Sequence, residues 1–215
     1  MRFIEAINEG DVVAHFLKYE IRSPRFGRAI SDVLQRNGWP TSLVEQPDPQ
    51  NAEECSIRAK ILSEFRGYQR NEGMFEGFPK DVAWARFAIS SLELMQVRYV
   101  DYSYWNELSG SSRLPSDAAI RIRKGAMVFG MNTHHFLEMA EALRNGAKDP
   151  ELILAGAETH SPLVVLEGHA RLTAYALAPD LIPTDLTAIV GLSAAMPAWR
   201  DFPLLDRNQL DADRK

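Results

Sequence analysis

The chain has 215 residues, of which 46% are hydrophobic and 25% are charged, and its net charge is −5 at pH 7. This balance is typical of a soluble globular chain, and at this length a folded domain buries roughly 70% of its unfolded surface without a disulfide or a metal. The composition excludes collagenous, disordered and disulfide-stapled proteins, and the negative charge disfavours a general polyanion-binding surface.

The single cysteine, Cys55, excludes an internal disulfide and a multi-cysteine zinc site, and it predicts a reducing compartment. Residues 1–9 lack the apolar core of a secretory signal. The longest weakly polar stretch, 187–199, is interrupted by Ser193 and Pro197 and is too short to span a bilayer. We therefore expect a cytoplasmic protein without a membrane segment.

Residues 1–78 are predicted to form a helical N-terminal extension. Ser23 and Pro24 are a favourable N-cap and first helical residue, and apolar residues at i, i+3, i+4 spacing follow until Gly38 ends the helix. A second helix is predicted over 52–68, where apolar residues recur on one face.

Residues 79–200 are predicted to form one α/β unit, and residues 201–215 a charged C-terminal tail. Alternating β-branched and aromatic residues predict a strand over 97–104. The pattern beyond it predicts helices over 114–125, 134–145 and 169–177, and strands over 152–155, 162–167 and 186–192.

The segment with the clearest chemistry runs from a buried strand through Glu167 and Gly168 into a helix. Such a turn is a ready anion site, because the first-turn amides are unpaired and the helix dipole is positive there. Gly168 allows close approach to the backbone, and Arg171 supplies a forked donor that suits phosphate oxygens. His169 can exchange a proton near neutrality, and Glu167 can accept a hydroxyl proton or hold Mg²⁺.

Residues 166–174 resemble the [D/E]-G-H-x-R-x-x-A signature of the ParB/sulfiredoxin-like superfamily. The resemblance is good over 162–176 and loose over 94–195. It implies a nucleotide, ATP, ADP or CTP with Mg²⁺, whose phosphates lie at Gly168, His169, Ala170 and Arg171. Glu167 and His169, the acid/base pair beside these phosphates, are the predicted catalytic residues.

Differences from known members of the superfamily reduce the number of activities that the resemblance implies. Sulfiredoxins have a cysteine directly after the motif glycine, where this chain has His169, and partition proteins carry a DNA-binding domain downstream. ParB-like kinases of free serine give the closest local match, although their motif usually begins with aspartate in place of Glu167. The motifs of P-loop, Rossmann dinucleotide-binding and α/β-hydrolase proteins are absent.

Further candidates precede the motif. Arg113 is predicted to bind phosphate or neutralise charge. Asp117 and Asp101 are candidate metal or supporting groups, and no residue is assigned as a metal ligand. The glycine- and serine-rich segment 109–113 is expected to move over the site. For Arg123 and Lys124, which extend the basic stretch, a solvated helix face is the preferred interpretation.

The sequence thus predicts an α+β protein in which a helical N-terminal extension joins a small ParB/sulfiredoxin-like α/β module. The predicted function is nucleotide-dependent phosphotransfer or hydrolysis on a small molecule. The alternative is a non-catalytic nucleotide-binding switch or adaptor, in a plasmid or phage-defence setting, whose N-terminal helices bind a protein partner. DNA binding of the partition type is disfavoured by the charge.

Overall fold

The computed structural model describes residues 1–147 and 150–203 and confirms the α+β class. Residues 204–215 of the predicted tail lie outside the described residues. The five-stranded sheet has the order β1-β2-β7-β5-β6, and its strands are β1 (Arg2–Ala6), β2 (Ala83–Ile89), β5 (Leu152–Gly156), β6 (Val164–Glu167) and β7 (Leu186–Leu192). Only β5 and β7 pair in parallel, and the other neighbours are antiparallel, so the sheet is mixed.

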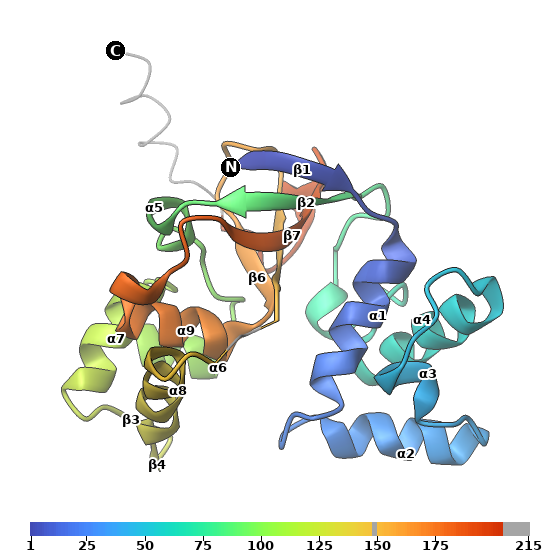
Figure 1. Ribbon diagram of the computed structural model, residues 1–215, viewed down its shortest axis with the longest axis horizontal. Helices are drawn as coiled ribbons and strands as arrows, with labels where there is room; N and C mark the ends of the chain where they lie inside the picture. The colour runs from blue at the N-terminus through green and yellow to red at the C-terminus, as the bar shows by residue number, and fades with distance from the viewer. Residues whose placement is uncertain (148–149, 204–215) are drawn as a thin grey trace.

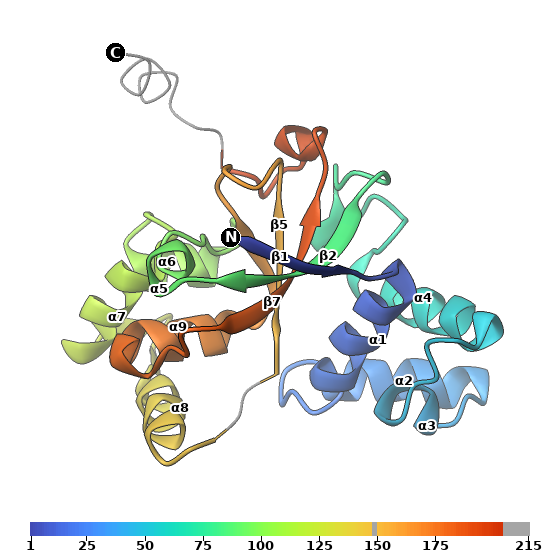
Figure 2. The same cartoon turned by 45° about the horizontal axis from the view of Figure 1, so that its top comes forward.

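Two groups of helices lie on opposite sides of the molecule, with the sheet between them (Figure 1). The first group contains α1 (Glu9–Glu20), α2 (Gly27–Asn37), α3 (Ser42–Glu45) and α4 (Ala52–Arg66). The second contains α6 (Ser103–Ser109), α7 (Pro115–Arg123), α8 (His134–Arg144) and α9 (His169–Leu177). The turned view in Figure 2 keeps the same separation. The remaining elements are short: η1 (Gly73–Phe75), α5 (Ser91–Leu94), β3 (Met127–Val128), β4 (Met131–Asn132), η2 (Pro179–Leu181) and η3 (Met196–Ala198).

One continuous hydrophobic core joins the two groups through the sheet. Every residue of β5 and β6 is buried, which explains why both strands read as apolar runs. Leu17 of α1, Ile61 of α4 and Leu172 of α9 have no exposed surface. Among the described residues, no helix is long and apolar enough to cross a bilayer.

Within residues 1–78 the observed elements differ in detail from the predicted ones. Residues 2–6 form the edge strand β1, which pairs with β2 and ties the first residues to the sheet. The second predicted helix is observed as α4, and it ends at Arg66 because Gly67 adopts a left-handed conformation with φ 82°. The helix predicted from Ser23 begins only at Gly27, since residues 23–26 form a turn closed by the Gly27 amide on the Ser23 carbonyl at 2.8 Å.

The predicted strand over 97–104 is wrong. Only Arg98 makes a bridge to β6, through Val164, and helix α6 begins at Ser103. Trp105 and Leu108 are three residues apart and both buried, so helical packing overrides the strand preference of the aromatic residues. The helices expected over 114–125, 134–145 and 169–177 are confirmed as α7, α8 and α9, and the three expected strands as β5, β6 and β7.

Candidate functional site

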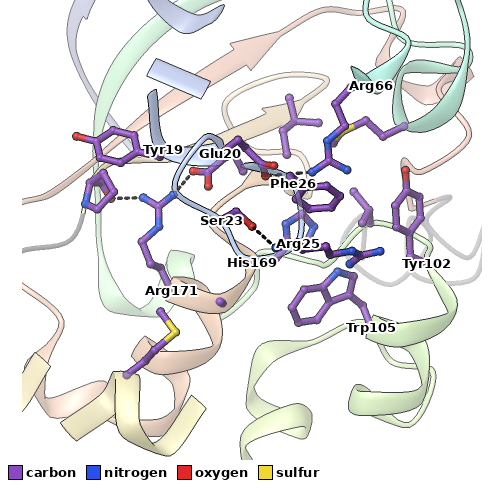
Figure 3. Close-up of a pocket in the computed structure, with 18 residues that line it drawn as sticks. Tyr19, Glu20, Ser23, Arg25, Phe26, Arg66, Tyr102, Trp105, His169 and Arg171 are labelled. Atoms are coloured by element: carbon purple, nitrogen blue, oxygen red, sulfur yellow. Dashed lines mark hydrogen bonds and ion pairs between the residues drawn. The ribbon is translucent and has the colours of Figure 1, made fainter. Parts of the chain in front are cut away.

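A cavity of about 370 Å³ lies between the helices of the N-terminal group and the turn that joins β6 to α9 (Figure 3). Its volume is within the range of about 300–1,000 Å³ found for small-molecule sites. The wall from the N-terminal group is formed by Tyr19, Glu20, Ser23, Arg25, Phe26, Arg66 and Met74. The opposite wall is formed by Val100, Tyr102, Trp105, Met139, Pro150 and residues 166–171.

The β6–α9 turn has the local geometry expected from the sequence. β6 ends at Glu167, Gly168 has φ 99°, and α9 begins at His169 without any side-chain cap. A Cβ on Gly168 would lie 2.3 Å from Leu152 Cδ2 and 3.2 Å from the Arg171 guanidinium. Only glycine therefore fits, and the uncapped start of a nine-residue helix borders the cavity.

Arg171 and Glu167 form a buried ion pair within this turn. The Arg171 Nη1 atom also donates hydrogen bonds to the carbonyls of Pro150 and Glu151, the latter at 2.9 Å. Both side chains are nearly buried, with 8% and 11% of their surface exposed. Their charged groups therefore tie the turn to the start of β5, and the geometry gives them a structural role rather than leaving them open to a ligand.

His169 lies at the start of α9 with its ring stacked on two aromatic side chains. The Trp105 ring is 4.9 Å away with an interplanar angle of 18°, and the Tyr99 ring is 6.2 Å away at 13°. Burial, together with the nearby cations Arg66 and Arg25, lowers the pKa of His169 to about 3. The imidazole is therefore neutral at pH 7 and is a poor general acid. Its Nε2 atom is buried and has no hydrogen-bond partner.

Glu20 and Arg66, the last residues of α1 and α4, form an ion pair of 3.0 Å at the cavity wall. Burial raises the pKa of the Glu20 carboxyl, although Arg66 opposes this effect. The Arg66 guanidinium carbon lies 3.7 Å above the centre of the Phe26 ring. Glu20 Oε2 and Arg66 Nε are both buried without a hydrogen-bond partner, like His169 Nε2. Three incompletely satisfied polar side chains therefore line one cavity.

Arg25 is the exposed cation of the site. Its guanidinium lies 4.8 Å from the centre of the Phe26 ring, and it makes no ion pair with a carboxylate of residues 1–147 or 150–203. It lies in the turn between α1 and α2, which is closed by the Ser23 hydroxyl accepting a hydrogen bond from the Arg25 amide at 3.3 Å (Figure 3).

The other predicted site residues do not line the cavity. Arg113 donates from Nε to the Tyr99 carbonyl at 2.7 Å and from Nη2 to the Asp201 carbonyl, so it braces the chain around residues 99 and 201. Asp101 is exposed and accepts a hydrogen bond from Asn106 at 2.7 Å. Asp117 lies in the first turn of α7. The structure therefore brings together Glu167, Gly168, His169, Ala170 and Arg171, but not Arg113, Asp117 or Asp101.

Sequence reasoning missed Glu20, Arg25, Arg66 and Trp105, which complete the site. They come from three helices and a turn that meet only in the folded chain, so no local motif links them. The one available signal is that Glu20 and Arg66 both lie in the segment predicted to be helical, where a charged residue is usually interpreted as solvated.

No group of three or more His, Cys, Asp or Glu side chains suited to a metal ion occurs in the part of the chain that the structure describes. A Mg²⁺ ion at this site would have to be held mainly by ligand phosphates, which is a common mode for this ion.

Comparison of the chain with protein-family models, with curated proteins and with solved structures finds no match.

Proposed function

We propose that this protein binds a phosphate-bearing small molecule of the nucleotide class in the cavity between α1, α4 and the start of α9. The observation that carries the proposal is the combination of an uncapped helix N-terminus with three unsatisfied polar side chains around the same cavity. Buried polar groups are nearly always hydrogen-bonded. Several buried polar atoms without a hydrogen-bond partner around one cavity therefore indicate that a ligand supplies the missing partner.

The phosphate end of the ligand would lie at the first turn of α9. The start of α9 has no side-chain cap, the positive end of the helix dipole attracts an anion there, and Gly168 leaves the backbone open to it. Arg25 supplies the positive charge, because its guanidinium is exposed and lacks a carboxylate partner among the described residues. Arg25 thus takes the role that the sequence assigned to Arg171.

The remainder of the ligand would lie against Tyr102 and against those parts of the Phe26 and Trp105 rings that Arg66 and His169 do not cover. Flat, apolar walls of this kind suit a heterocycle, since aromatic side chains stack on the face of any base. Glu20 Oε2 can accept one hydrogen bond from the ligand and Arg66 Nε can donate one. These partners would orient the ligand within the cavity.

The resemblance of residues 162–176 to the ParB/sulfiredoxin-like superfamily supports the same proposal. It favours ATP, ADP or CTP, with Mg²⁺ bound through the phosphates, in a cytoplasmic protein. In the adaptor form of the proposal, ligand binding without turnover would regulate a protein partner of the N-terminal helices.

Hydrolysis or phosphoryl transfer is the second candidate, and Glu20 is the observation that favours it. A buried carboxyl with a raised pKa and one unpartnered oxygen, located in a cavity, is a candidate general base. Glu167 is less suited to that role because Arg171 occupies it. Under this proposal Glu20→Gln retains nucleotide binding and loses phosphate release, whereas Glu45→Gln, on the exposed end of α3, retains both.

The test of binding is thermal stabilisation by ATP, ADP, CTP and GTP, each with and without Mg²⁺. A ligand present at about 100 times its Kd adds about 2.7 kcal/mol to the free energy of unfolding, which a melting curve detects. We expect at least one nucleotide to stabilise the wild type and Arg28→Gln, an exposed arginine of α2 outside the cavity, but not Arg25→Gln. If no nucleotide stabilises any of the three chains, the proposal is wrong.

A further inference from the structure

A second cavity, of about 540 Å³, lies between the start of α1, the loop after α4, η1 and the start of β2 with the loop before it. It shares no lining residue with the first cavity. Its walls include four aromatic side chains: Tyr68, Phe75, Phe78 and Trp84. The Phe75 ring contacts Tyr68 at 5.1 Å and Phe78 at 5.3 Å between centroids, both edge to face, so the three rings present differently oriented surfaces.

Glu9 is the only carboxylate among the residues that line this cavity. It accepts a hydrogen bond from the Tyr68 hydroxyl, which fixes the carboxylate beside the aromatic rings. Partial burial raises the pKa of Glu9, because the charged carboxylate has lost part of its water without gaining a cation. The Glu9 carboxylate, which has no cationic partner among the described residues, therefore lies among electron-rich aromatic rings.

The loop that carries this wall has a fixed and unusual backbone. Gln69 and Asn71 line the cavity and have φ values of 61° and 57°, a conformation that residues other than glycine rarely adopt. Asn71 Oδ1 accepts a hydrogen bond from the Gly77 amide at 2.6 Å, which holds the loop closed. The cavity wall is thus built by specific contacts rather than by loose packing.

The titratable groups facing the cavity are Glu9, Tyr68 and Lys80. Lys80 is exposed on the loop before β2 and is the only cationic side chain in the lining. It opposes a positive ligand. Glu9 and Lys80 are both exposed residues, but the Tyr68 hydroxyl holds the Glu9 carboxylate beside the rings, whereas no hydrogen bond or ion pair with a described residue holds the Lys80 ammonium there.

We infer that this cavity binds an organic cation, of the quaternary or alkylammonium class. The cationic head would lie against the faces of Phe75, Phe78 and Trp84, with Glu9 as its counter-ion. Aromatic rings attract a cation through the negative charge on their faces, and the attraction is strongest where water is excluded. This cavity is separate from the first one. It would select a cation, whereas the first cavity would select an anion.

The test uses choline as the probe and 3,3-dimethylbutan-1-ol as its uncharged isostere, each titrated by calorimetry into the full chain. We expect choline to bind at least about tenfold more tightly than the alcohol, since only the cation gains the aromatic and carboxylate interactions. Glu9→Gln should weaken choline binding by about tenfold. Phe78→Leu, which keeps an apolar wall without a π face, should weaken it as well.

The matched control is Glu53→Gln, a first-turn glutamate of α4 that is exposed and lies outside both cavities. It should leave choline binding unchanged, and Lys80→Ala should leave it unchanged or tighten it. The inference is overturned if choline does not bind the wild type, if the alcohol binds equally well, or if Glu53→Gln weakens binding as much as Glu9→Gln. Nucleotide binding by the Glu9→Gln variant should equal that of the wild type, so failure here is distinguishable from failure at the first cavity.

Discussion

Arg171 and Glu167 are the pair of residues on which the β6–α9 turn most depends. Each is buried, and each is the ion-pair partner of the other. Arg171→Ala leaves the Glu167 carboxylate buried without its cation, so the free energy of unfolding should fall by about 3–5 kcal/mol. Urea denaturation measures this, with Arg28→Ala as the exposed control that should change stability by less than about 0.5 kcal/mol. Equal midpoints for the two variants would contradict a structural role for Arg171.

Gly168 has a steric role that can be separated from its backbone conformation. Gly125 also has a left-handed conformation, with φ 77°, but a Cβ there would have nothing within 4 Å. Gly125→Ala should cost only about 1–2 kcal/mol, the price of the left-handed backbone. Gly168→Ala should cost about 1–3 kcal/mol more, because the new Cβ would overlap Leu152. Equal losses of urea stability in the two variants would show that the overlap is relieved.

His169 makes the stability of the protein depend on pH. Its pKa is lowered to about 3 in the folded chain, whereas an unfolded histidine has a pKa of about 6.5. Between these values the unfolded chain binds more protons, so this residue should make stability fall as the pH drops from about 6.5 towards 3. Urea midpoints of wild type and His169→Gln, measured at pH 7 and pH 5, should show a smaller fall in the variant. A fall of the same size in both would exclude His169 as the source.

At the scale of elements, the helix α4 begins with a side-chain cap that supports one wall of the first cavity. Asn51 Oδ1 accepts hydrogen bonds from the Glu53 amide at 3.1 Å and the Glu54 amide at 3.2 Å. Asn51→Ala should lower the free energy of unfolding by about 1 kcal/mol, and Asn51→Asp should lower it much less, since aspartate caps equally well. Thermal unfolding measures both variants. A loss in Asn51→Asp as large as in Asn51→Ala would mean that another property of asparagine matters here.

Elements with a strong local signal were predictable from the sequence. The apolar runs of β5 and β6, the glycine at 168 and the spacing of α9 specify the strand–turn–helix unit without reference to the rest of the chain. The edge strand β1 was not predictable, because all its residues are exposed and only its pairing with β2 makes it a strand. Residues 97–104 were wrongly predicted as a strand because their β-branched and aromatic residues favour strands in isolation, whereas the segment runs into helix α6 from Ser103.

Only one of the two walls of the candidate site was predictable from the sequence. Residues 167–171 are local to one motif, so the sequence identifies the turn. Whether Arg171 is free or paired depends on the backbone of Pro150 and Glu151 and on the burial of Glu167, which no sequence pattern reveals. The cations that remain available, Arg25 foremost, come from a different part of the chain.

At the scale of the whole molecule, the first cavity depends on two groups of helices that meet around one turn. The N-terminal group contributes Glu20, Arg25 and Arg66, and the other side contributes Trp105 and the start of α9 (Figures 1 and 3). A ligand that pairs with both sides would join the two groups, so its binding should stabilise the molecule as a unit.

The most direct measurement is a ¹H–¹⁵N NMR titration of the full chain with ATP, ADP and CTP in the presence of Mg²⁺. The account predicts that at least one nucleotide shifts the backbone amides of His169, Ala170 and Arg171 more than those of β1, which lies at the opposite edge of the sheet from β6, and that Arg25→Gln reduces these shifts. If all three nucleotides leave the first-turn amides of α9 unchanged, the central claim of a phosphate-binding site at this helix is contradicted.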